Sequence, residues 1–206
     1  MRLRNISNSK EIISKSLYNF SPTQLQTNTK NLLELEIGMG KGDFLISKAI
    51  LNPDIFFIGI EKYPSVQLSA LKKLNDMNYI NNLKLLTIDA TEIPTFFVSN
   101  SISRIYLNFS DPWPKLKHAK RRLTSQKYFS IFEKILFKSG IIEIKTDQKS
   151  LYNFTLEQLD FFPNLKVLET SLDLHNFKSN QILTEYEKRF ILENHQIFYI
   201  KVVKVY

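Results

Sequence analysis

Four acidic side chains accompany four successive apolar runs of this sequence. Glu36, Glu61, Asp89 and Asp111 each stand within or directly after a run that is typical of a β-strand. Parallel strands end at the same edge of a sheet, where open α/β sheets bind their ligands, so we expect these carboxylates to share one cleft. For any one of them the alternative is a helix N-cap, and Asp89, before Ala-Thr-Glu, fits that alternative best.

The turn that contains Asp111 is the most distinctive, because residues 108–115 read Asn-Phe-Ser-Asp-Pro-Trp-Pro-Lys. Pro112 and Pro114 fix φ and withhold backbone donors, so the chain leaves its sheet there with Asp111 and Trp113 on a stiff turn. Taken alone, the run favours an Asp-Pro turn packed by a buried tryptophan. The other strand ends favour a ligand site instead.

A glycine-rich loop follows the run that ends at Ile37, and its sequence is Gly38-Met39-Gly40-Lys41-Gly42. Glycines permit positive φ and a close approach of backbone to ligand, although a tight β-to-α turn is the alternative. The Gly-x-Gly-x-Gly spacing differs from the Gly-x-Gly-x-x-Gly of dinucleotide enzymes. Glu36 would repel a pyrophosphate and attract a cationic amine, so S-adenosylmethionine fits better than NAD. Glu61, about 20 residues beyond the loop, is placed to accept both hydroxyls of a ribose.

Strand and helix patterns alternate along the chain, which indicates one α/β domain over residues 31–206. We expect strands near 32–37, 55–60, 83–88, 102–109, 140–146, 164–169 and 196–205, and helices near 43–51, 64–77, 124–138 and 148–160. These elements predict a seven-stranded sheet with six connections. Residues 1–30 are polar and contain no glycine, so we expect an N-terminal arm with little order.

Several function classes are excluded by composition. The chain has no cysteine, and its three histidines lack metal-ligand spacing, so we expect no metal. There is no legible Ser/His/Asp arrangement, no apolar run of membrane-spanning length and no apolar signal core at the start. We therefore expect a cytoplasmic protein that does not bind membranes.

A basic run follows the Asp-Pro-Trp turn. It contains Lys115, Lys117, His118, Lys120, Arg121 and Arg122, in a chain of net charge +8. A solvated surface is the ordinary interpretation of such a run, and a general bias toward lysine explains part of the charge. Its position next to the carboxylate edge favours a phosphate-binding role instead, with a nucleic acid held there while one base enters the cleft.

These motifs together resemble the bacterial tRNA (guanine-N7)-methyltransferases, which use S-adenosylmethionine in a Rossmann-like class I fold. The resemblance covers about residues 33–204 and rests on these pieces in order: 36–42, Gly59-Ile60-Glu61, Asp89-Ala90, 108–115, 118–124, Lys145-Thr146-Asp147 and 184–190. The Asp-Pro-Trp-Pro-Lys turn and the Thr-Glu-Tyr-Glu segment are specific to this family. Many methyltransferases share the glycine loop.

The resemblance implies a mostly parallel seven-stranded sheet with helices on both faces, and it implies residue roles. The cofactor site would comprise Glu36, Gly38, Gly40, Glu61, Asp89 and Asp111, with Asp111 also catalytic. The substrate site would comprise Lys115, Asp147, Thr184, Glu185, Tyr186 and Glu187, while Lys120, Arg121 and Arg122 would contact the RNA backbone. The products would be 7-methylguanosine in the variable loop of tRNA and S-adenosylhomocysteine. We expect a monomer or homodimer with no obligate protein partner.

The chemistry suits so sparse a site, because guanine N7 carries a lone pair and no proton and needs no general base. Two other interpretations remain open from the sequence. A methyltransferase acting on an exocyclic amine of nucleic acid also has a polar residue and a Pro-aromatic turn after its fourth strand, although usually as Asn/Asp-Pro-Pro-aromatic. A non-catalytic RNA-binding module would need the basic run but not four carboxylates, and binding of S-adenosylmethionine separates it from both enzymes.

Overall fold

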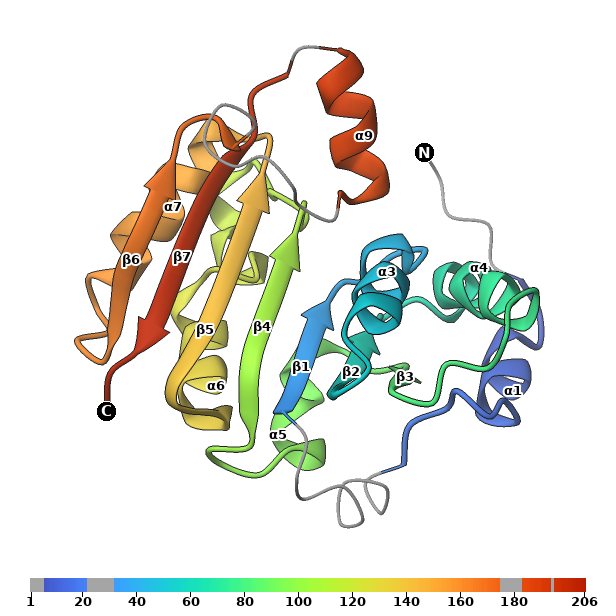
Figure 1. Ribbon diagram of the computed structural model, residues 1–206. Coiled ribbons are helices and arrows are strands. Elements are labelled where there is room, and N and C mark those ends of the chain that lie inside the picture. The colour runs from blue at the N-terminus through green and yellow to red at the C-terminus, as the bar shows by residue number, and fades with distance from the viewer. Residues whose placement is uncertain (1–5, 22–31, 175–182, 194) are drawn as a thin grey trace.

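The computed structural model describes residues 6–21, 32–174, 183–193 and 195–206. In these residues seven strands form one sheet in the order β3-β2-β1-β4-β5-β7-β6 (Figure 1). The strands are β1 (Leu32–Ile37), β2 (Ile55–Ile60), β3 (Leu83–Leu86), β4 (Ile102–Asn108), β5 (Leu136–Thr146), β6 (Leu165–Ser171) and β7 (Phe198–Lys204). Only β7 runs antiparallel to its neighbours. The predicted α/β class and strand number are confirmed.

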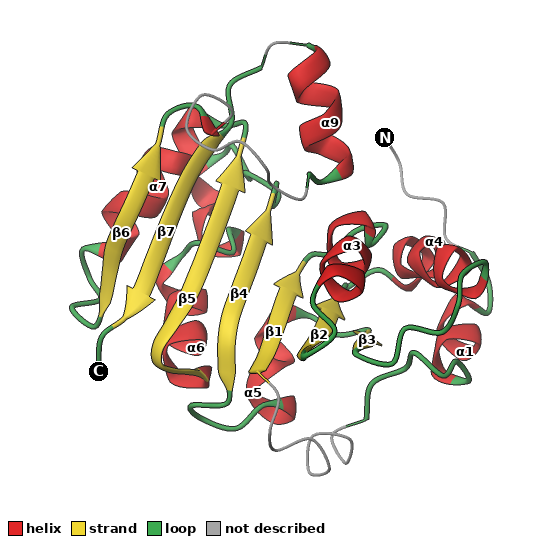
Figure 2. Ribbon diagram, in the orientation of Figure 1, coloured by secondary structure: helices red, strands yellow, loops and turns green. Residues whose placement is uncertain are grey.

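Helices cover both faces of this sheet (Figure 2). On one face lie α3 (Asp43–Leu51), α4 (Pro64–Asn75) and α1 (Ser9–Ser14); on the other lie α5 (Ile93–Phe96), α6 (Gln126–Ile135) and α7 (Lys149–Leu159). Two short 3-10 helices, η1 (Ala90–Glu92) and η2 (Leu116–Arg121), follow β3 and β4. Helix α9 (Glu185–Leu192) lies beyond the carboxyl ends of β4 and β5.

Alternation along β1 decides which face carries its carboxylates. Leu33, Leu35 and Ile37 pack into the main core, together with side chains of α5, α6 and α7. Successive side chains of a strand point to opposite faces, so Glu34 and Glu36 lie on the face covered by α3. The apolar side chains of β1 are therefore buried in the main core, and its acidic side chains lie on the other face of the sheet.

Element boundaries differ from the prediction at one informative place. The helix predicted to reach residue 138 ends at Ile135, and β5 begins at Leu136 rather than at residue 140. Apolar residues at 136 and 137 suit either element, and Leu136 pairs with Ile102 of β4. Ser139 has a φ of 68°, and β5 continues through this irregular position.

Residues 6–21, part of the expected N-terminal arm, pack onto the domain. Ile13 and Tyr18 are buried in a cluster with residues of α4, and Phe20 reaches the main core. The chain also pairs with β3, since Leu85 N–H donates to Tyr18 O (2.7 Å) and Phe20 N–H donates to Leu85 O (2.9 Å). Burial of Ile13, Tyr18 and Phe20 stabilises this packing, although the segment is polar on average. The rest of the expected arm, 1–5 and 22–30, lies outside the described residues.

Candidate active site

The glycine loop after β1 adopts backbone angles that other residues rarely adopt. Gly38, Gly40 and Gly42 have φ of 79°, 57° and 78°. A Cβ on Gly42 would lie 2.9 Å from the Cβ of Ala70, so packing requires glycine there. A Cβ on Gly38 or Gly40 would meet nothing within 4 Å. These two glycines therefore leave open space above β1, as a ligand-binding loop requires.

Glu36 lies beneath this loop and is only 2 % exposed. Asn108 Nδ2 of β4 donates to its Oε1 at 2.8 Å, whereas Glu36 Oε2 and Asn108 Oδ1 are buried and accept no hydrogen bond from the described residues. Burial raises the pKa of Glu36 to about 8. Buried acceptors without partners are costly, so the pair fits a ligand that brings N–H donors and positive charge. The amino group of S-adenosylmethionine has this chemistry.

Glu61 follows β2 and links three parts of the site. Its Oε2 accepts from Gly40 N–H (3.2 Å) and its Oε1 from Tyr63 N–H (2.9 Å). Burial raises the pKa of Glu61, and the negative charge of Asp111 contributes in the same direction. Glu61 and Asp111 follow β2 and β4, the two strands that flank β1.

Asp89 behaves as the helix cap that its sequence suggested. Its Oδ1 accepts from Thr91 N–H (3.0 Å). Glu92 Oε1 accepts from Asp89 N–H (2.9 Å), which completes a capping box at η1. Lys62, directly after Glu61, pairs with Asp89 Oδ2 at 2.8 Å. The Lys62 hydrogen bond is the main cause that lowers the pKa of Asp89 to about 2. Asp89 thus remains a fixed anion at the same edge as Glu61.

The Asp-Pro-Trp turn carries local strain and a buried clamp. Phe109 and Trp113 have φ of 50° and 41°, while the side chain of Asp111 is exposed. Arg122 Nε donates to Pro112 O (2.9 Å) and Nη2 donates to Trp113 O (3.1 Å). Its guanidinium lies 4.3 Å from the ring centroid of Phe154 on α7.

Arg122 was predicted to contact the RNA backbone; in the structure its side chain lies inside the protein. The residue is 7 % exposed, and its donors are directed at carbonyls of the turn. The physical reason lies in the turn itself. The chain has left the sheet at this point, so no strand pairs with the carbonyls of Pro112 and Trp113. A forked guanidinium can satisfy two such oxygens at once. Arg122 therefore holds the turn from inside.

The other basic residues of the run stay on the surface. Lys115, Lys117, Lys120 and Arg121 are exposed on or beside η2, and we name them the basic tract. The Arg121 guanidinium lies 5.0 Å from the Trp113 ring, and His118 meets the edge of the same ring at 5.6 Å. The basic tract is thus attached to the turn that presents Asp111.

Helix α9 brings the late Thr-Glu-Tyr-Glu segment to the same edge of the sheet. Thr184 Oγ1 accepts from Glu187 N–H (2.9 Å), and Glu187 Oε2 accepts from Thr184 N–H (2.8 Å), which forms a second capping box. Glu187 is 0 % exposed, whereas Tyr186 is 56 % exposed and stacks on Phe109 at 5.8 Å. Glu185 begins the helix; its side chain lies outside the described structure.

Asp147 completes the set of predicted substrate residues at the end of β5. It is partly buried, and Gln148 Nε2 donates to its Oδ2 at 2.7 Å. The sequence interpretation missed two neighbours of this site, Asn108 and Lys145. Both were visible as polar residues at the ends of apolar strands, on the face that alternation gives to Glu36. Lys145 Nζ donates to Glu187 Oε1 at 2.8 Å inside the protein.

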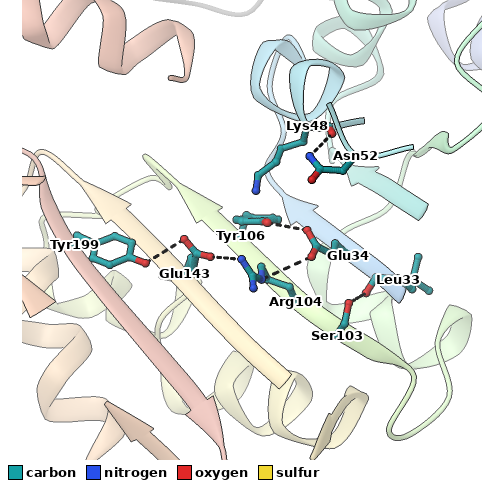
Figure 3. Close-up of polar contacts among 9 residues, drawn as sticks. All are labelled: Leu33, Glu34, Lys48, Asn52, Ser103, Arg104, Tyr106, Glu143 and Tyr199. Carbon is teal, nitrogen blue, oxygen red and sulfur yellow. Dashed lines mark hydrogen bonds and ion pairs between the residues drawn. The ribbon is translucent and has the colours of Figure 1, made fainter. Parts of the chain in front are cut away.

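A second polar layer, which begins at Glu34 on β1, crosses the same face (Figure 3). Tyr106 Oη donates to Glu34 (2.7 Å), Arg104 pairs with Glu34 (3.7 Å) and Glu143 (2.7 Å), and Tyr199 Oη donates to Glu143 (3.0 Å). Burial raises the pKa of both tyrosines, which keeps them neutral donors. The chain of contacts joins β1, β4, β5 and β7 and forms a rigid base under the site.

Two absences hold for the part of the chain that the structure describes. No cluster of three His, Cys, Asp or Glu residues there could hold a metal ion. Within the same residues, no helix combines the length and apolar character needed to cross a membrane.

Comparison with known proteins assigns the family. Residues 30–200 match the family described as "Putative methyltransferase". The tRNA (guanine-N(7)-)-methyltransferase of Lachnoclostridium phytofermentans is 42 % identical over 199 residues, which is 92 % of this chain and 92 % of that protein. The protein of the same name from Mycoplasma pneumoniae is 41 % identical over 195 residues, with 93 % of each covered. The chain belongs to the bacterial tRNA (guanine-N7)-methyltransferase family.

Solved structures agree on the fold. The 16S rRNA methyltransferase KamB superposes on this family member with a TM-score of 0.68 at 13 % identity, covering 94 % of this chain and 98 % of KamB. A mutant 16S rRNA (adenine(1408)-N(1))-methyltransferase with cosubstrate SAM, from Catenulisporales acidiphilia, gives a TM-score of 0.64 at 13 % identity, covering 94 % and 96 %. The Rossmann-like class I fold implied by the sequence is confirmed.

Proposed function

We propose that this protein transfers the methyl group of S-adenosylmethionine to N7 of a guanine in the variable loop of tRNA. The products are 7-methylguanosine and S-adenosylhomocysteine. One observation carries the proposal: under the open glycine loop, the Glu36–Asn108 pair keeps two buried acceptors that no described residue satisfies. Relatives about 40 % identical bear the name of this activity, and a structural neighbour was solved with cosubstrate SAM. We place the reaction in the cytoplasm, with its tRNA substrate.

The cofactor-binding roles follow from the chemistry of each side chain. Glu36 receives the amino group, and Gly38 and Gly40 leave room for the backbone to approach the ligand. Glu61, fixed by Gly40 and Tyr63, receives the ribose hydroxyls. The remaining edge is formed by Asp89 and Asp111, and Asp89 is held as an anion by Lys62.

The methyl transfer itself demands little of the protein. The bound cofactor supplies an electrophilic methyl group on a sulfonium centre. Guanine N7 attacks without losing a proton, so Asp111 acts as an electrostatic and orienting group and not as a base. It accepts from the N–H edge of the base and offsets the positive charge that develops on the ring. Most of the acceleration then comes from holding N7 in line with the methyl group.

The tRNA-binding roles are divided between two sides of the edge. On one side the basic tract, which contains Lys115, Lys120 and Arg121, faces the phosphate backbone. On the other side Asp147 and the surface of Tyr186 line the entry for the base, while Thr184 and Glu187 shape α9 from within.

One experiment tests the proposal. The purified protein is incubated with unmodified tRNA and methyl-labelled S-adenosylmethionine, and the digested nucleosides are separated. Label in 7-methylguanosine supports the proposal. Label in a nucleoside methylated on an exocyclic amine would overturn the choice of acceptor atom, and a failure to bind the cofactor in a calorimetric titration would overturn the enzyme assignment.

A further inference from the structure

A row of buried polar side chains runs from the cofactor pocket to helix α9. Glu36 on β1 contacts Asn108 on β4 at 2.8 Å, and Asn108 is the register partner of Lys145 on β5. Lys145 donates to Glu187 at 2.8 Å, and Glu187 closes the capping box with Thr184 at the start of α9. All five residues are buried. The row therefore joins the proposed cofactor carboxylate to the proposed tRNA-facing segment without reaching the surface.

We propose that Lys145 is a positioning residue that couples the cofactor pocket to the tRNA-facing helix α9, because its ammonium binds Glu187 of α9 while its register partner Asn108 binds Glu36 of the pocket. This inference rests on the proposed function. Lys145 binds Glu187 directly, and its register partner Asn108 binds Glu36. The positive charge of Lys145 favours the ionised form of Glu36, the group that receives the cofactor amine. Its bond to Glu187 fixes the first turn of α9 across the end of β5.

A purely structural ion pair is the competing explanation, and the surroundings argue against it. Helix α9 is already packed through Phe190 and Tyr186, whose rings lie 5.5 and 5.8 Å from that of Phe109. Burying two charges is expensive, and apolar residues of similar size often hold elements together at least as well. An ammonium at this position is better explained by its effect on the charge of Glu36, whose Oε2 accepts no hydrogen bond from the described residues.

The charges around Glu36 make the coupling measurable. Asn108 on β4 and Lys145 on β5 favour its ionised form, whereas Asp43 on α3 and Glu187 on α9 disfavour it. Cofactor binding requires ionised Glu36, so affinity should fall on the acid side of the pKa of this carboxyl. Removing Lys145 should raise that pKa, and removing the charge of Glu187 should lower it. We call the fall in cofactor affinity at low pH the acid limb of the binding profile. Substitutions of the two members of this ion pair are expected to shift the acid limb in opposite directions.

The test compares Lys145→Met, Lys145→Arg and Glu187→Gln in the full-length protein. Lys204→Met is the matched control, since Lys204 is also a buried lysine of this sheet, bonded to Leu136 O (2.7 Å) and Asn100 Oδ1 (2.9 Å) at the opposite end. Affinity for S-adenosylmethionine is titrated from pH 6 to 9 without tRNA. The KM for tRNA and the melting temperature are measured for each variant.

We expect K145M to move the acid limb upward by about one pH unit, and E187Q to move it downward. Both variants should raise the KM for tRNA about tenfold, because the first turn of α9 is no longer fixed across the end of β5. K145R should keep the wild-type limb, and K204M should lower only the melting temperature. If K145M does not fold, E187Q and K145R carry the same test.

The inference is overturned if the variants of Lys145 and Glu187 change the melting temperature as K204M does and leave the acid limb and the KM for tRNA unchanged. It is also overturned if the two neutral variants move the limb in the same direction. Failure of the proposed function is distinguishable, since the wild-type protein itself would then bind no cofactor or methylate no tRNA.

Discussion

Charged groups at the carboxyl edge of this sheet fall into an exposed set and a buried set. Asp111, Lys120 and Arg121 are exposed on the turn after β4 and on η2. Glu36, Arg122 and Lys145 lie beneath them and are almost fully buried. In the sequence the two sets meet at Arg121 and Arg122, which are neighbours. Their surroundings give them different roles. The exposed groups can contact a ligand, and the buried groups stabilise the conformation of the site.

The difference teaches that adjacency in a basic run says little about the role of each cation. A cation that meets phosphate has to keep its donors in water, and its contribution falls with added salt. A cation that satisfies buried carbonyls gives the same donors to the protein, and losing it leaves those oxygens unpaired. Substitutions in the two sets should therefore differ in their effects on protein stability, on the salt dependence of tRNA binding and on the rate of methyl transfer.

The largest effect is expected from the exposed carboxylate. Asp111→Ala should lower turnover by roughly 10²- to 10³-fold, because one preorganised electrostatic contact to the developing charge is lost. The melting temperature should stay unchanged, since the side chain is exposed. Steady-state kinetics with tRNA measure the effect, with Asp54→Ala, exposed before β2, as the control. Near wild-type turnover would remove Asp111 from the catalytic role.

The buried carboxylate should show a trade of stability against function. The folded pKa of Glu36 is about 8, above its ordinary value of 4.5, so the folded state holds the proton more tightly. Without cofactor, stability should fall as pH rises from about 4.5 to 8, and remain lower above that range. Glu36→Gln should therefore gain on the order of a few kcal/mol over wild type by about pH 9, while its cofactor affinity drops.

Thermal melting of the cofactor-free protein at a series of pH values measures this effect. The stability advantage of E36Q should grow with pH across the window. Glu157→Gln, at an exposed position of α7, serves as the control. Parallel curves for E36Q and wild type would contradict the assignment of Glu36 as a protonated, poorly solvated carboxyl.

The adjacent arginines provide the sharpest matched pair. Arg122→Met should destabilise the protein by about 1 to 3 kcal/mol, because two carbonyls of the turn lose their donors, and turnover should fall as Asp111 loses its fixed position. Arg121→Met should leave the melting temperature unchanged and weaken tRNA binding. Denaturant titration and steady-state kinetics on both variants measure these effects. Equal stability of the two variants would mean that the hydrogen bonds of Arg122 do not stabilise the protein.

The sequence could predict the fold and the edge because both follow from local patterns. Alternation in Leu-Leu-Glu-Leu-Glu-Ile fixes the face of Glu36, and strand order places the ends of β2 and β4 on either side of β1. It could not predict the role of Arg122, since the two carbonyls it binds become unsatisfied only when the turn folds. Lys145 was missed for a related reason: its partner Glu187 lies 42 residues away on α9. Pairings over such distances are set by tertiary structure.

The smallest effect, and the most diagnostic of the exposed set, should come from the basic tract. Lys120→Ala with Arg121→Ala should raise the KM for tRNA severalfold and reduce the log–log salt slope of binding by about two units, one for each phosphate contact. Cofactor affinity and melting temperature should not change, because neither side chain is buried. Lys134→Ala with Lys138→Ala removes two exposed lysines at the opposite end of the sheet and controls for net charge. If both double variants flatten the slope equally, tRNA is attracted by the overall charge of the protein and the basic tract has no special place in binding. A loss confined to the first double variant would show that the exposed cations next to Asp111 meet the backbone of the substrate.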